Sequence, residues 1–135
     1  MISQFIDCYD HDIPLTWFDR ELKSVTGIDI YDDVFPYDKG YLRVEKGNID
    51  LLVMRVELSD NTKREMIENL INIPHFALTN SNVSSQKKYS LSYREFCKEI
   101  RLPESYLERL LTSKYARHFY SDSELEGFWK RWRCS

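Results

Sequence analysis

Glycine, proline and cysteine are scarce in this chain of 135 residues, and each scarcity excludes a class of protein. Four scattered glycines cannot build a glycine-rich phosphate loop, and neither GxxxxGK[ST] nor GxGxxG occurs. With only four glycines and four prolines there is no flexible linker, so we expect a single domain over residues 1–135. Cys8, Cys97 and Cys134 are odd in number and far apart, which argues against a disulfide framework and favours a reducing compartment.

Long apolar runs and targeting segments are also missing. Residues 1–6 are too short for the core of a signal peptide, and Asp7 interrupts them. No stretch approaches the roughly 20 apolar residues of a membrane helix. We therefore expect a soluble, cytoplasmic protein without a membrane span.

Motifs of metal sites and of nucleophilic catalysis are absent, since neither HExxH nor GxSxG is present. Four aspartates between residues 29 and 38 have the composition of a calcium loop but lack its glycine and glutamate positions, so we interpret them as turn residues and caps. His11, His75 and His118 have no spaced partners, and a structural role is the simpler interpretation of each. The sequence thus indicates no catalytic residue and no metal ligand.

What is present is typical of a folded domain: 42% hydrophobic residues and 19 aromatic side chains exclude disorder. The net charge of −3 is unevenly distributed. Residues 1–60 carry 13 acidic and 6 basic side chains, whereas residues 61–135 carry 9 and 13. The second part is the better candidate for contact with an anion, although a solvated helix face would give the same imbalance. Nothing in this charge pattern points to nucleic acid.

Hydrophobic periodicity predicts one helix, two strands and then several helices. A helix is expected over residues 13–25, ended by Gly27. Strands over 41–45 and 49–56 are joined by a turn at 47–48, which favours a hairpin. The further expectations are a helix over 63–72, a short extended segment at 75–79, and helices from residue 88 onward with capping boxes at Ser92/Glu95 and Ser121/Glu124.

Two features indicate that this chain packs against more structure. The four consecutive apolar residues at 51–54 are typical of a strand covered on both faces, yet two strands make a poor independent sheet. In the last predicted helix, Leu125, Phe128, Trp129 and Trp132 share one face, which must dock against something large. We therefore expect a helix-rich α/β fold with two or three strands, as part of a larger unit.

The segment 80–90 is the best candidate binding site. Asn82, Ser84, Lys87 and Lys88 lie just before a predicted helix start, where backbone amides and lysine charge can hold an anion. A plain polar loop followed by a helix start is the alternative, because a helix start by itself requires only capping residues.

Several segments together resemble the C-terminal part of the putative capsular polysaccharide synthesis proteins, a sulfotransferase-like group. Residues 87–90 are similar to its Asn-Lys-Trp-Tyr-Ser signature, with Gln86 and Lys88 in place of Asn and Trp. In order along residues 13–132, the segments are Trp17–Lys23 with Thr26–Tyr31, Asn48–Arg55, Lys87–Ser90 and Ser113–Ser121.

The resemblance implies a P-loop-type fold with a parallel sheet, the donor 3′-phosphoadenosine 5′-phosphosulfate and a saccharide acceptor. The donor-binding loop of such enzymes precedes the part that this chain matches. We therefore expect a C-terminal portion that is inactive alone, with a missing N-terminal region or a protein partner, and with Asn82, Ser84, Lys87 and Lys88 as its remaining cofactor-binding candidates. The alternative is a non-catalytic binding or assembly module that uses its aromatic helical face.

Overall fold

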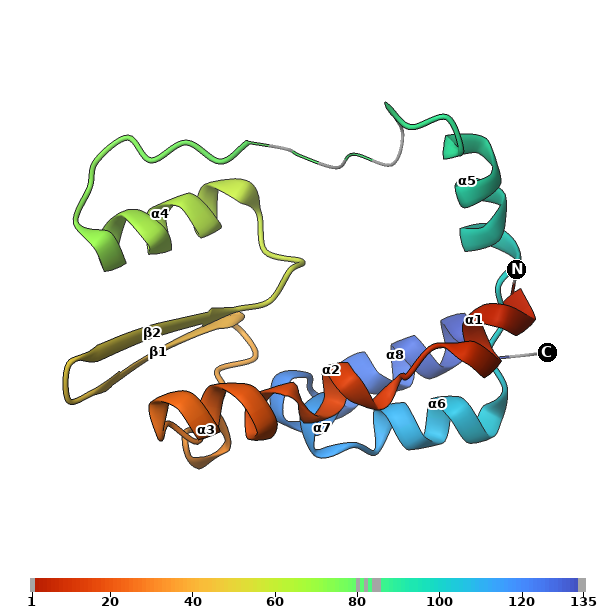
Figure 1. Ribbon diagram of the computed structural model, residues 1–135, viewed down its shortest axis with the longest axis horizontal. Helices are drawn as coiled ribbons and strands as arrows, with labels where there is room; N and C mark the ends of the chain where they lie inside the picture. Colours follow the sequence, from red (N-terminus) through yellow and green to blue (C-terminus); the bar gives the residue numbers. More distant parts are fainter. Residues whose placement is uncertain (1, 80, 82, 84–85, 134–135) are drawn as a thin grey trace.

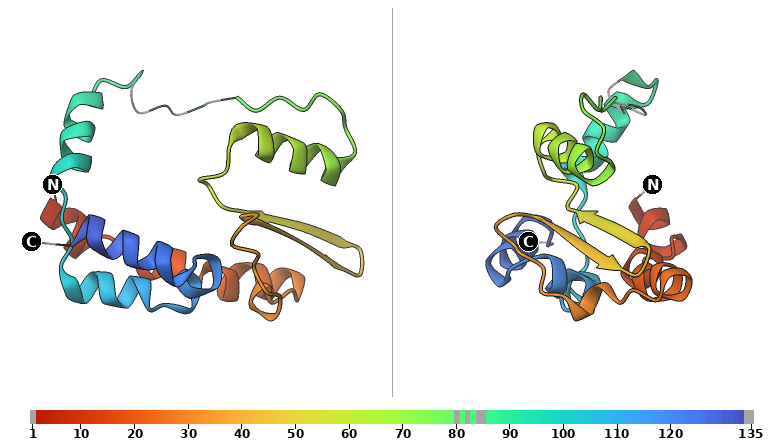
Figure 2. Two further views of the ribbon diagram at one scale, coloured as in Figure 1. Left: turned by 180° about the vertical axis from the view of Figure 1, so that it is seen from behind. Right: turned by 90° about the vertical axis from the view of Figure 1, so that its left-hand side faces the viewer.

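The computed structural model describes residues 2–79, 81, 83 and 86–133. Helices dominate, and the sheet has two antiparallel strands. In Figure 1, α4 lies on one side of the hairpin, and α2, α3, α6, α7 and α8 lie on the other. Helix α5 stands apart at the end of the molecule where both chain ends lie. The opposite view in Figure 2 shows the same arrangement. The helix-rich part of the expected α/β class is therefore confirmed.

The N-terminal region holds two helical stretches. The first, α1 (Ile2–Cys8), was not predicted from the sequence. The second runs without interruption from Asp12 to Thr26, as α2 (Asp12–Trp17), a π-helical turn (Phe18–Leu22) and α3 (Lys23–Thr26). Gly27 ends it with φ +69° and donates its N–H to the Lys23 carbonyl, as expected for a left-handed C-cap.

The predicted hairpin is present as β1 (Tyr41–Lys46) and β2 (Ile49–Met54), after a short 3₁₀ turn at Ile30–Asp32. The strands pair in a register that places Leu42 opposite Val53 and Val44 opposite Leu51. These four side chains pack against a core cluster made of Ile30, Phe35 and Phe119.

The strand expected over residues 49–56, covered on both faces, is shorter and less buried than predicted. The strand ends at Met54, Val56 is 79% exposed, and residues 51–54 are only half-buried. The core covers one face of the hairpin and α4 contacts β2, so the four apolar residues are covered on both faces but incompletely.

Helix α4 (Asp60–Ile71) begins at Ser59, whose hydroxyl accepts the Thr62 N–H, and ends at Asn72 in the left-handed conformation. The helix predicted from the sequence began at residue 63, three residues after the observed start of α4. The segment 75–79 is irregular and forms no strand, and His75 within it has φ +62°.

Four helices complete the described chain: α5 (Ser90–Glu99), α6 (Glu104–Leu111), α7 (Lys114–Phe119) and α8 (Asp122–Trp132). The capping box at Ser121 and Glu124 is confirmed. The one at Ser92 is wrong, because α5 begins at Ser90 and places Ser92 inside the helix. Tyr89 takes the N-cap position without a side-chain hydrogen bond.

The aromatic face of α8 docks within this chain. Trp129 and Trp132 pack against a second cluster formed by Ile100, Leu102 and Leu107. The Leu102 N–H also donates to the Trp132 carbonyl at 2.8 Å. The large docking surface that the sequence required is therefore supplied mainly by α6 and the segment before it.

Leu107, which is 1% exposed, tests this second cluster. Leu107→Ala should lower the free energy of unfolding by about 2–5 kcal/mol, because it removes buried methyl groups and leaves a cavity. Leu91→Ala in α5 is the matched control; Leu91 is 67% exposed and the change should stay within about 0.5 kcal/mol. Urea denaturation measures both, and equal effects would show that the cluster is not a core.

Candidate functional site

The anion segment predicted from the sequence lies only partly within the described residues. Asn82 and Ser84 lie outside them. Lys88 is exposed and Lys87 is half-buried, with its Nζ 5.8 Å from the centroid of the Tyr89 ring. Both lysines directly precede α5, so basic side chains do stand at a helix N-terminus. Whether the four residues form one site stays a prediction.

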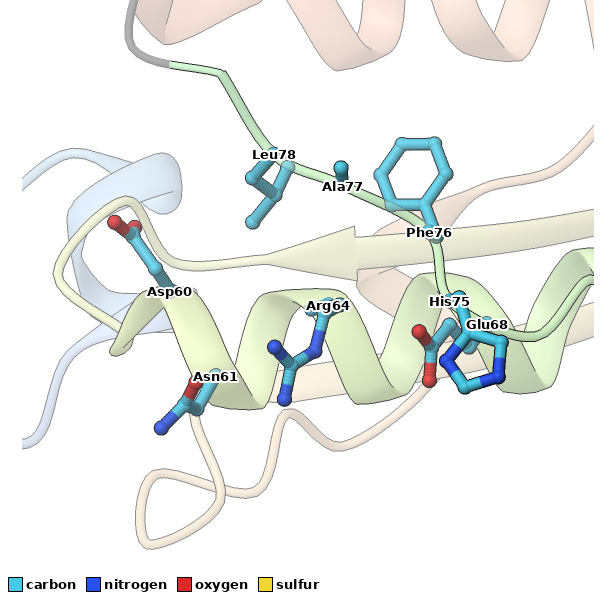
Figure 3. A pocket seen from close by; sticks show the side chains of 8 residues that line it. All are labelled: Asp60, Asn61, Arg64, Glu68, His75, Phe76, Ala77 and Leu78. Atoms are coloured by element: carbon cyan, nitrogen blue, oxygen red, sulfur yellow. The ribbon is translucent and has the colours of Figure 1, made fainter.

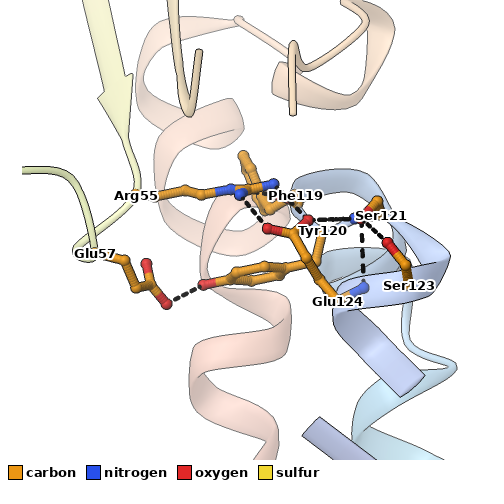
Figure 4. Close-up of polar contacts among 7 residues, drawn as sticks. All are labelled: Arg55, Glu57, Phe119, Tyr120, Ser121, Ser123 and Glu124. Atoms are coloured by element: carbon orange, nitrogen blue, oxygen red, sulfur yellow. Dashed lines mark hydrogen bonds and ion pairs between the residues drawn. The ribbon is translucent and has the colours of Figure 1, made fainter. Parts of the chain in front are cut away.

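The most connected polar group is Arg55, the residue that follows β2. Its side chain is only 10% exposed. Nε donates to the Phe119 carbonyl at 2.7 Å, and the two terminal nitrogens donate to Oε1 and Oε2 of Glu124 at 2.7 and 3.2 Å. Figure 4 shows this fork between the end of the strand and the start of α8. A bidentate arginine–carboxylate pair of this kind has fixed geometry as well as strength.

Aromatic rings surround the same guanidinium. Its central carbon lies 4.6 Å from the Tyr120 ring centroid and 5.5 Å from that of Phe35. Such cation–π contacts strengthen as water is removed. Together with the ion pair, they offset the cost of burying a charge that this position would otherwise incur.

Glu124 and Tyr120 extend this network. Burial would raise the pKa of Glu124, but hydrogen bonds from the Ser121 N–H and hydroxyl and from Arg55 outweigh it and hold that pKa below its usual range. Burial and the hydrogen bond that Tyr120 donates to Glu57 at 2.9 Å raise the pKa of the Tyr120 phenol. These hydrogen bonds tie the residues that follow β2 to the end of α7 and the start of α8.

A second group of contacts joins half-buried residues of α7 to Tyr31. Tyr31 and His118 pack edge to face with ring centroids 4.9 Å apart, and Lys114 lies 3.8 Å above the Tyr31 ring. Within the described part of the chain, the Tyr31 hydroxyl and His118 Nε2 are buried without a hydrogen-bond partner. Burial raises the pKa of Tyr31 to about 12.

The His118 imidazole is held neutral by its surroundings. Burial lowers its pKa below the usual 6.5 and the Lys114 ammonium lowers it further, against the opposing effect of a hydrogen bond to the Ile30 backbone. A neutral, enclosed imidazole against Phe119 and Tyr31 fits the structural role expected for it.

An open cleft lies between α4 and the segment after it, with a volume of about 530 Å³. As Figure 3 shows, one wall comes from α4 and the other from residues 75–78. The lining residues are Asp60, Asn61, Arg64, Glu68, His75, Phe76, Ala77 and Leu78. Sequence reasoning missed this site, because it predicted a helix over 63–72 and a short extended segment at 75–79 without any signal that the two lie against each other.

No group of three or more His, Cys, Asp or Glu side chains among the described residues is arranged to hold a metal ion. None of the described helices is long and apolar enough to cross a membrane.

Comparison with known proteins gives one match. The model of the family described as "Putative capsular polysaccharide synthesis protein" aligns with residues 8–121. The chain belongs to this family. No curated protein and no solved structure matches it.

The capsular polysaccharide synthesis match spans α2 to α7 and ends at Ser121. It therefore includes Arg55, His118 and the cleft over α4, whereas Glu124 and the rest of α8 lie beyond it. The segment that holds the predicted anion residues is inside the match as well. The resemblance drawn from four short segments is thus confirmed at the level of the family.

His118 gives a pH test of the neutral, structural interpretation. Because its pKa is lowered in the folded state, the unfolded chain takes up a proton first, and stability should fall as the pH drops below 6.5. His118→Gln should remove this part of the pH dependence. Thermal unfolding of both proteins between about pH 7 and pH 5.5 measures it. An NMR titration midpoint for His118 at or above 6.5 would contradict the interpretation.

Proposed function

We propose that this protein acts in the synthesis of a capsular or cell-surface polysaccharide as the C-terminal portion of a sulfotransferase-like unit. The complete unit would transfer sulfate to a saccharide hydroxyl, with cationic groups holding the phosphates of the donor. The observation that carries the proposal is the family match over residues 8–121. The sulfotransferase part rests on the resemblance of the segments described above.

The incomplete cover of the hairpin supports a larger unit. A two-stranded sheet with half-buried residues on β2 gains little stability by itself, and further strands at its edges would complete it. A P-loop fold would supply such strands. β1 and β2 pair antiparallel. The parallel sheet of a P-loop fold would therefore have to be formed by the further strands of the proposed unit.

The donor, 3′-phosphoadenosine 5′-phosphosulfate, fits the residues of this chain only in part. Lys87 and Lys88, before the uncapped start of α5, suit one phosphate group, with Asn82 and Ser84 as further candidates. The sequence holds no glycine-rich loop for the 5′-phosphosulfate. We therefore derive no step of sulfate transfer for this chain alone.

A second candidate is a non-catalytic binding or assembly module. A groove of about 420 Å³ favours it, since apolar side chains such as Phe96, Leu110 and Phe128 line most of it. A large exposed apolar patch around Trp129 and Trp132 would have favoured it more, but both tryptophans pack against the second cluster.

A donor-binding experiment tests the predicted anion residues. Adenosine 3′,5′-bisphosphate should bind weakly and lose affinity as salt screens exposed charges. The double variant Lys87→Ala/Lys88→Ala should bind about tenfold more weakly still, since two charge-assisted contacts are removed. NMR amide shifts report the affinity and the location, and thermal melting should be nearly unchanged.

The matched control is Lys39→Ala/Lys98→Ala, which removes the same charge from two exposed sites, one of them at the opposite end of α5. It should bind like the unmodified protein. If both double variants weaken binding equally, the effect is one of net charge and the segment is only a helix start.

An activity assay completes the test. With labelled phosphosulfate donor and a mixture of glycans, the chain alone should give no turnover above a blank, because the donor cradle is not encoded. Clear turnover by the purified chain would contradict the proposal that the donor-binding loop belongs to another part of the unit.

A further inference from the structure

The cleft over α4 combines two walls of different character. Asp60, Arg64 and Glu68 are spaced four residues apart along α4, so their side chains follow one face of the helix. The opposite wall is formed by His75 and three apolar residues, of which Leu78 is 41% exposed and points its side chain toward the helix in Figure 3. A row of polar groups facing an apolar wall is the general composition of a small-molecule site.

The polar groups of this cleft are available to a ligand. Among the described residues, neither the Arg64 guanidinium nor the Glu68 carboxylate makes a hydrogen bond or an ion pair, although their i,i+4 spacing would permit one. Asp60 has only a distant contact with Lys63, at 4.0 Å. The cleft thus presents both donors and acceptors that the protein itself does not use.

The backbone of the upper wall is held in an uncommon conformation. His75, with φ +62°, lies in the left-handed region directly after Pro74, and it turns the chain back over α4. A non-glycine residue in this region costs about 1 kcal/mol or more, and such residues gather at ligand sites. The left-handed conformation of His75 turns the chain so that residues 76–78 lie opposite α4.

The charged side chains that line the cleft favour a neutral ligand over an anionic one. Two carboxylates, Asp60 and Glu68, face one guanidinium, Arg64, so the lining repels an anionic donor such as a nucleotide. Carboxylates accept hydrogen bonds from hydroxyls, the Asn61 amide does both, and Arg64 donates. Sugar rings carry many hydroxyls and have apolar C–H faces that suit the wall at Ala77 and Leu78. A volume of about 530 Å³ lies in the usual range for such sites.

We propose that the cleft between α4 and residues 75–78 binds neutral saccharide, and that it is the acceptor site of the unit. The acceptor role rests on the proposed function, whereas saccharide binding by the cleft does not. For transfer, the sulfate of the donor would have to reach a hydroxyl of the bound saccharide at the mouth of this cleft.

A glycan array of bacterial oligosaccharides, neutral and acidic, tests the proposal with the labelled full chain. Binding to neutral hexose oligosaccharides should exceed binding to uronic-acid oligosaccharides. Glu68→Gln and Arg64→Ala should each reduce the affinity for the bound glycans about tenfold, as expected for the loss of one charge-assisted hydrogen bond. Their melting temperatures should stay near that of the unmodified protein, since both positions lie at the surface of α4.

The matched control is Glu65→Gln, the same substitution on the same helix at an exposed position outside the cleft. It should bind glycans like the unmodified protein. The proposal is overturned if no glycan binds, if acidic glycans are preferred, or if Glu65→Gln and Glu68→Gln have equal effects.

Adenosine 3′,5′-bisphosphate separates this proposal from the proposed function. Glycan binding without bisphosphate binding would keep the saccharide cleft and remove the sulfotransferase part. Bisphosphate binding without glycan binding would remove the cleft and leave the sulfotransferase part intact.

Discussion

The guanidinium of Arg55 joins three parts of the chain that are far apart in the sequence. Arg55 follows β2, and its guanidinium donates to the last carbonyl of α7 at Phe119 and pairs with Glu124 in the first turn of α8. An arginine that is 90% buried is costly unless all its donors are used. Because the fork and the surrounding rings satisfy it, the hairpin has one defined position on the C-terminal helices.

The rest of the molecule depends on that position. The two core clusters are small, one under the hairpin and one between α6 and α8. Helix α4 contacts the chain through β2 and has no fully buried residue. The proposed saccharide cleft is therefore attached to the hairpin, and Arg55 fixes the hairpin relative to the helices that follow the basic segment. The proposed function thus depends on this ion pair to hold the hairpin in place, although the pair itself takes part in no reaction.

Most local signals were read correctly from the sequence, the box at Ser92 and Glu95 excepted, whereas contacts between distant residues were not predicted. Gly27, the 47–48 turn and the Ser121/Glu124 box act within four residues, so their outcome is visible in the chain itself. Arg55 and Glu124 are 69 residues apart, and nothing in the sequence around either residue indicates that the two form a pair. A single charge directly after four apolar strand residues was the available signal for Arg55. The cleft was hidden for the same reason, since its upper wall depends on the turn at His75.

A double-mutant cycle between Arg55 and Glu124 tests the central claim most directly. Arg55→Ala, Glu124→Ala and the double variant are compared with the unmodified protein by urea denaturation. The account predicts a coupling free energy of about 1–3 kcal/mol, because each single change leaves the other charged side chain without its ion-pair partner. A coupling near zero, with additive single effects, would show that the fork is a surface contact and that the hairpin is positioned by other means.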